Sequence, residues 1–240
     1  YETYQRNENG GWKYVRINFQ KNTFDNLHKN IIHLQSMFAV TFTANRDSRW
    51  LYEILQFLYK HIEELNQAEF ASLFKDFLEK MAVRYAEGRL FTEEDIIKKY
   101  GDIPVYAFNF IDYILWKNRE ELGRKYKGVK FDHFKFAYRR SIEHWFPQHP
   151  NSDEKIEKMD DQFLHSFGNL CIITDSQNSK FGNLVPSAKY KQWEGIFDRQ
   201  SLKLQTMANI TEKTKWESYQ IKGLEKEILP MVKRFIESKS

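Results

Sequence analysis

The chain has 240 residues, of which 41% are hydrophobic and 16% are aromatic, which is too much apolar material for a disordered protein. The length allows one large or two small folded domains, and no stretch approaches the roughly 20 consecutive apolar residues that cross a membrane. The net charge is only +4, so a local patch could contact a polyanion, but the overall charge does not argue strongly for it.

The cysteine content indicates the compartment. Cys171 is the single cysteine, which excludes an internal disulfide framework and fits a reducing cytoplasm. Its apolar neighbours predict a small core residue rather than a nucleophile or a zinc ligand. Residues 1–6 show no secretory signal, and the missing initiator Met is what we expect of a fragment. We therefore expect a cytoplasmic protein.

Helical periodicity dominates the first half of the chain. Apolar residues recur at spacings of three and four in 50–65 and, more regularly, in 70–85. Thr92, followed by three acidic residues, predicts the N-cap of a short helix over 92–101. Another strong helix is expected after Pro104. We interpret these stripes as core and assign them no function.

The period then changes. Apolar and polar residues alternate over 134–138, which predicts a strand, and 169–174 is a second run that favours β-structure. After Asp175 the pattern becomes helical again, ending in a helix over 216–235 with a kink at Pro230. The expected fold is mainly helical, with a small unit of two strands and a helix embedded in it.

Polar residues with catalytic potential gather in this two-strand unit. Glu143 can bind a hard divalent cation, and a neutral His144 beside it can take a proton from water. Gly168 permits an unusual backbone angle, and Asn169 can hydrogen-bond a neighbouring loop. Asn178, near a helix start, offers a second oxygen ligand. Phosphodiester hydrolysis needs a metal ion, a base and a group that holds the base in place.

These motifs resemble those of the HNH, or His-Me finger, endonucleases, which have a ββα-metal core. More narrowly, they resemble the C-terminal nuclease domain of GmrSD-like modification-dependent restriction proteins. That domain shows a carboxylate-His-x-x-Pro-Gln element, then Gly-Asn-Leu, then an Asn about nine residues on and a downstream Lys. This chain has them at 143–148, 168–170, Asn178 and Lys189. One departure is Trp145, where many relatives have an aliphatic residue.

The resemblance implies a mainly α protein with an embedded small ββα-metal unit. We expect a helical domain over 1–130 and a nuclease domain with C-terminal helices over 131–240. The implied activity is metal-dependent cleavage of double-stranded foreign or phage DNA by a restriction or anti-phage protein. The chain has no Gly-rich phosphate loop, so a nucleotide-dependent domain would lie upstream or on a partner chain.

The resemblance also implies roles for individual residues. His144 is the general base, and Asn169 orients the loop that carries it. Glu143 and Asn178 are the expected ligands of one Mg²⁺ or Mn²⁺ ion, since oxygen donors bind these hard cations better than they bind zinc.

Lysines and histidines near the motif are less informative. Lys180 and Lys189 are candidate contacts to DNA phosphate, although an exposed lysine is usually only solvated. His149 and His165 lie close to the motif in sequence, and neither is assigned a role.

Each candidate residue has a plainer interpretation. His144 can be a structural histidine, Glu143 a member of an ordinary ion pair, Asn178 a helix cap and Asn169 a turn residue. At the level of the whole chain, the alternatives are a nucleic-acid-binding or assembly module with an inactive nuclease core, and a purely helical interaction module. The first predicts binding without metal-dependent cleavage, and the second predicts neither.

Overall fold

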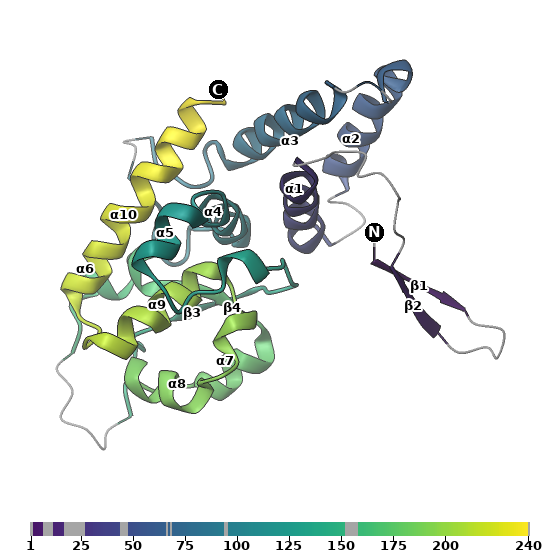
Figure 1. The fold of residues 1–240 in the computed structure, drawn as a ribbon. Coiled ribbons are helices and arrows are strands. Elements are labelled where there is room, and N and C mark those ends of the chain that lie inside the picture. Colours follow the sequence, from purple (N-terminus) through teal and green to yellow (C-terminus); the bar gives the residue numbers. More distant parts are fainter. Residues whose placement is uncertain are drawn as a thin grey trace.

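The computed structural model describes residues 2–6, 12–16, 27–43, 48–65, 67, 69–93, 96–151 and 158–239. Most of these residues are helical (Figure 1). This agrees with the expected mainly α fold.

The N-terminal part combines a hairpin with three helices. β1 (Glu2–Arg6) and β2 (Trp12–Arg16) pair antiparallel in a hairpin that was not expected from the sequence. α1 (His28–Thr41) follows, and α2 (Arg49–Lys60) and α3 (Phe70–Ala86) confirm the helices predicted from their periodicity. α3 packs against α1, and both pack against the next helix along the chain.

That next helix, α4 (Val105–Lys117), is the centre of the core (Figure 1). Every residue from Tyr106 to Trp116 is buried, which is the pattern of a helix covered on all sides. It confirms the helix predicted after Pro104, and it contacts α1, α3, β4, α9 and α10. Asp112 joins it to α9, because its buried carboxylate accepts the backbone N–H of Lys203 at 2.9 Å.

The predicted short helix over 92–101 is wrong for the residues that the structure describes there. Phe91 and Ile97 form a β-bridge, and Thr92 exchanges hydrogen bonds with Ile96. The Thr92 hydroxyl accepts from the backbone of Ile96 and closes a turn, where a helix cap was expected. Such local side-chain bonds compete with helix formation. The turn at Gly101 has a φ of 99°, which favours glycine.

The strand predicted over 134–138 is also misplaced. That segment has no regular secondary structure, and the strand is β3 (Ser141–His144), which pairs antiparallel with β4 (Leu170–Ile173). Phe134 and Phe136 both lie against the ring of His33 on α1, with centroids 5.9 and 5.8 Å away. The alternation of apolar residues therefore reflects packing on a helix, whereas β4 agrees with the strand predicted at 169–174.

The strand pair packs against α4 and against two of the remaining helical elements, α7 and α9. The remaining helical elements are α5 (Arg119–Lys125), η3 (Ile62–Glu64), η4 (Phe131–His133), α6 (Asp161–Leu164), η5 (Phe167–Asn169), α7 (Asp175–Phe181), α8 (Pro186–Trp193), η6 (Phe197–Arg199), α9 (Leu202–Lys213) and α10 (Ser218–Glu237). α10 confirms the predicted last helix and continues through Pro230.

One hydrophobic cluster runs through most of these elements. It includes residues on both sides of position 130, for example Phe108 and Phe167, whose ring centroids are 5.8 Å apart. The division into domains at residue 130 stays a prediction. In the described part of the chain, no helix has both the length and the apolar character needed to span a bilayer.

Candidate active site

β3, β4 and α7 form a unit of two antiparallel strands followed directly by a helix. His144 is the last residue of β3 and pairs with Leu170, the first residue of β4. α7 begins after β4 with a capping box, in which Thr174 and Gln177 each bind the other's backbone N–H. The far end of α7 returns to the end of β3, where the Phe181 and Trp145 rings lie 6.0 Å apart.

The buried side chain of Lys189, on α8, binds the end of β3 from the protein interior. Its ammonium donates to Glu143 Oε1 at 2.6 Å and to the carbonyl oxygens of His144 at 2.7 Å and Trp145 at 2.9 Å. The side chain is 0% exposed, and all three bonds point into the protein. This geometry does not fit the DNA phosphate contact expected of Lys189, because the ammonium would have to leave three buried acceptors to reach solvent.

Glu143 is therefore a member of a buried ion pair. Burial raises the pKa of its carboxyl, and the charge of Lys189 acts in the opposite direction. Among the described residues, Lys189 is the donor to Oε1, and no donor binds Oε2. One carboxylate oxygen thus remains available to another partner.

His144 is a buried imidazole that contacts a second histidine. Its Nε2 lies 3.1 Å from Nδ1 of His165 and 3.4 Å from Nε2 of Gln148. The Tyr100 ring covers it with a centroid distance of 4.4 Å. Burial, with the charges of His165 and Lys189 as smaller contributions, lowers the pKa of His144 to about 4. The imidazole is accordingly neutral at neutral pH, which is the state a general base requires.

Asn169 ties the loop after β3 to its surroundings. Its Oδ1 accepts from the backbone N–H of Phe146 at 2.9 Å and from the indole N–H of Trp216 at 3.1 Å. Its Nδ2 donates to the carbonyl oxygens of Phe146 and Leu164 at 3.0 and 2.9 Å. Its own carbonyl oxygen accepts from Trp145 N–H at 2.8 Å. Every polar atom of this fully buried amide holds the backbone that follows His144.

Asn178 and Lys180 lie on α7, and both are exposed. The N-cap of α7 is Thr174, so Asn178 is not the helix cap that the plainer interpretation allowed. Among the described residues, no group of three or more His, Cys, Asp and Glu side chains is placed to hold a metal ion. The expected ligand pair of one carboxylate and one amide is not a group of that kind, so it stays a prediction.

The sequence around this site matches a known protein family. The family model for the C-terminal domain of GmrSD restriction endonucleases matches residues 91–230. The chain belongs to this family. No curated protein and no solved structure matches it.

The match to the GmrSD C-terminal family covers the whole candidate site. The matched segment begins before α4 and ends within α10, and it includes β3, β4, α7 and every candidate site residue. The helices α1 to α3 precede it. The family is one of restriction endonucleases, so it supports the expected nuclease function.

Sequence reasoning missed several residues of this GmrSD-type site. Lys203 is buried in α9, and its ammonium donates to the carbonyl oxygens of Phe167, at 2.8 Å, and of Leu170. These bonds hold the turn that leads into β4. Burial lowers its pKa to about 8. The apolar run around Lys203 could have indicated a buried lysine, because its neighbours Leu202 and Leu204 predict a core helix. Tyr100, far from the motif in sequence, carried no such signal.

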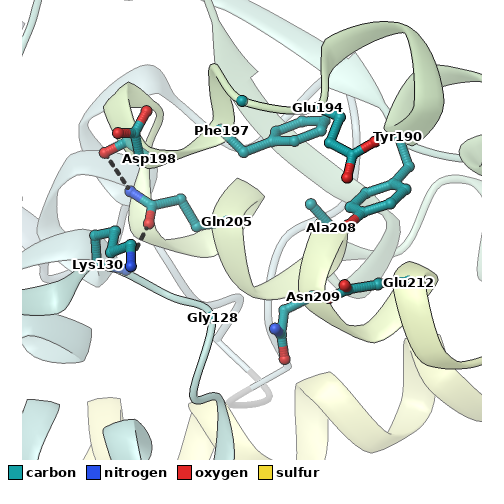
Figure 2. A pocket seen from close by; sticks show the side chains of 11 residues that line it. Gly128, Lys130, Tyr190, Glu194, Phe197, Asp198, Gln205, Ala208, Asn209 and Glu212 are labelled. Atoms are coloured by element: carbon teal, nitrogen blue, oxygen red, sulfur yellow. Dashed lines mark hydrogen bonds between the residues drawn. The ribbon is translucent and has the colours of Figure 1, made fainter.

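The GmrSD-type chain also has a cavity of about 260 Å³ between α8, α9 and the loop after α5 (Figure 2). Its aromatic wall is Tyr190 and Phe197, whose rings stack with centroids 5.8 Å apart. The charged side chains that line it are Glu194, Asp198, Glu212 and Lys130. Three carboxylates against one lysine repel phosphate, so this cavity is not a DNA-backbone site.

Proposed function

We propose that this chain is an HNH-type endonuclease that hydrolyses DNA phosphodiester bonds at the unit formed by β3, β4 and α7. The observation that carries the proposal is the placement of His144. It is neutral at neutral pH, stands beside a carboxylate at a strand end, and is followed by a loop held by Asn169. This arrangement occurs in a chain that belongs to a restriction endonuclease family.

In this proposal His144 takes a proton from the water that attacks the phosphorus atom. Asn169 acts as a positioning residue, since its contacts are with the loop and not with the reacting atoms. A buried and rigid loop keeps the imidazole in one orientation, so little reorganisation is needed when the reaction begins.

The proposed metal ligands are Glu143 and Asn178, for one Mg²⁺ or Mn²⁺ ion. Both residues offer oxygen, which suits hard cations, and Oε2 of Glu143 has no donor among the described residues. Magnesium sites commonly use one or two protein oxygens and complete their coordination with water and substrate phosphate. When bound, such an ion neutralises the charge that develops on the phosphate and the leaving oxygen.

The proposed substrate is double-stranded foreign or phage DNA, and the proposed role is restriction in the cytoplasm. Lys180, exposed on α7, is the candidate contact to the DNA backbone. We do not retain Lys189 as a DNA contact, because it supports β3 from the interior. A nucleotide-dependent domain, upstream or on a partner chain, is the proposed source of regulation.

The test is cleavage of plasmid and phage DNA with Mg²⁺ or Mn²⁺, with and without EDTA. We expect metal-dependent cutting that falls by about 10²- to 10⁴-fold in His144→Ala, the usual contribution of a general base. His133→Ala is the matched control, because His133 is an exposed histidine on η4. Both variants should unfold at a denaturant concentration close to that of the wild type.

The main alternative gives a different result in the same assay. A binding module with an inactive core retains DNA in a mobility-shift assay, but none of the three proteins cuts it. If His144→Ala cuts as fast as His133→Ala, the proposed base is wrong.

A further inference from the structure

His144 and His165 share one hydrogen bond, and its direction decides which ring nitrogen of His144 can act as a base. A neutral imidazole carries one proton, so one nitrogen donates and the other accepts. The contact is between Nε2 of His144 and Nδ1 of His165, at 3.1 Å. That is a good hydrogen-bond length, whereas the 3.4 Å to Gln148 is near the upper limit.

The other nitrogen of His144 has a different environment. Nδ1 makes no hydrogen bond with any residue in the described part of the chain, and the residue keeps 7% of its surface exposed. A nitrogen that must receive a proton from water needs a free lone pair. Nε2 has its direction occupied by His165, so Nδ1 is the nitrogen that can meet water.

We propose that His165 is a positioning residue, which accepts a hydrogen bond from Nε2–H of His144 and thereby fixes Nδ1 as the basic nitrogen. The inference rests on the proposed function for the role of His144, but the hydrogen bond itself does not depend on catalysis. His165 presents its Nδ1 as the acceptor, and this contact with Nε2 of His144 is the shorter of the two.

Two further contacts hold His165 in place for this role. Its carbonyl oxygen accepts the backbone N–H of Tyr100 at 3.0 Å, and the Tyr100 ring stacks on it with centroids 6.0 Å apart. The same Tyr100 ring lies 4.4 Å from the ring of His144. The tyrosine therefore contacts both imidazoles and limits their rotation. The three rings form a small aromatic cluster, which we call the His144–His165–Tyr100 cluster.

The first test reads the tautomer directly, without DNA or metal. The free protein is labelled with ¹⁵N-histidine, and the ring nitrogens of His144 are assigned by comparison with His144→Ala. We expect the proton on Nε2 in the wild type at pH 7. In His165→Leu, which removes the acceptor, the His144 signals should shift toward a mixture of the two tautomers.

Asn at position 165 provides the conservative rescue. The Oδ1 atom of Asn branches from the same carbon position as Nδ1 of His, so His165→Asn can still accept the bond. The expected result is an Nε2–H tautomer in His165→Asn and a loss of that preference in His165→Leu. A purely structural role for His165 does not predict this difference between the two variants.

The second test measures DNA cleavage by the same proteins. His165→Leu should lower the cleavage rate on the order of 10- to 100-fold, the usual effect of removing a group that orients a functional imidazole. His165→Asn should recover most of it, and the exposed control His133→Leu should match the wild type.

The outcomes separate this inference from the proposed function. A proton on Nδ1 in the wild type overturns the inference, as does an Nε2–H signal that does not change in His165→Leu. If the tautomers behave as expected but no variant cuts DNA, the hydrogen bond is established and the proposed function fails.

Discussion

Replacing Lys189 by Met tests the buried support of β3. Methionine keeps an unbranched chain of similar length, but it removes the ammonium that bonds to Glu143 and two backbone carbonyl oxygens. Removing one partner of a buried ion pair costs about 3–5 kcal/mol, because the other charge stays buried without compensation. Each carbonyl left without a donor costs about 1–3 kcal/mol on its own, although the three losses do not add.

We therefore expect Lys189→Met to lower the free energy of unfolding by about 3–5 kcal/mol. That is a large part of the roughly 5–15 kcal/mol that stabilises a typical domain. Urea unfolding followed by tryptophan fluorescence measures it. The matched control is Lys191→Met, two residues on in α8 and exposed, with an expected change within about 0.5 kcal/mol.

The double variant Glu143→Gln/Lys189→Met refines the test. Burial raises the pKa of Glu143 despite the nearby ammonium, which indicates that desolvation outweighs the attraction in this pair. Neutralising both groups should thus cost less than removing the lysine alone. A loss below about 1 kcal/mol in Lys189→Met, or a double variant less stable than the single one, would refute the reasoning.

Three further predictions concern the surroundings of the site. Asn169→Ala removes four side-chain hydrogen bonds and should lower both the unfolding free energy and DNA cleavage; unchanged cleavage contradicts the positioning role. Gly168→Ala places a Cβ 2.5 Å from the carbonyl oxygen of Ile221 on α10 and should cost about 1–3 kcal/mol in urea unfolding. Burial raises the pKa of Asp112 to about 7, so wild-type stability should fall by up to roughly 4 kcal/mol as pH rises from about 4 to 7. Asp112→Asn should remove that slope, and an equal slope in both proteins contradicts it.

Local periodicity predicted much of the fold. The helices α2, α3 and α4 and the strand β4 follow from runs whose own spacing determines their structure. β3 was misplaced because only four residues form it, and its position is set by pairing with β4, which begins only at Leu170. The turn at Thr92 was predicted as a helix because the same residues that cap helices also close turns.

Some residues of the candidate site could likewise be predicted from local sequence, and others depend on tertiary packing. Glu143, His144 and Asn169 stand in a recognisable order in the sequence, and the structure brings the loop after His144 and Asn169 into contact. The burial of Lys189 could not be predicted, since it depends on where α8 packs rather than on neighbours in sequence. His165 was noticed and given no role, because its partner lies 21 residues away.

The two tryptophans beside the site connect it to the C-terminal helices. Trp145 donates its indole N–H to Thr211 on α9 at 2.8 Å, and Trp216, just before α10, donates to Asn169 at 3.1 Å. An aliphatic residue at position 145 would have no such donor. The loop and Asn169 cannot leave their places without breaking the bonds to Thr211 on α9 and to Trp216 in the segment before α10. The active-site loop, α9 and the start of α10 should consequently exchange their amide hydrogens together, as one cooperative unit whose opening energy approaches that of global unfolding.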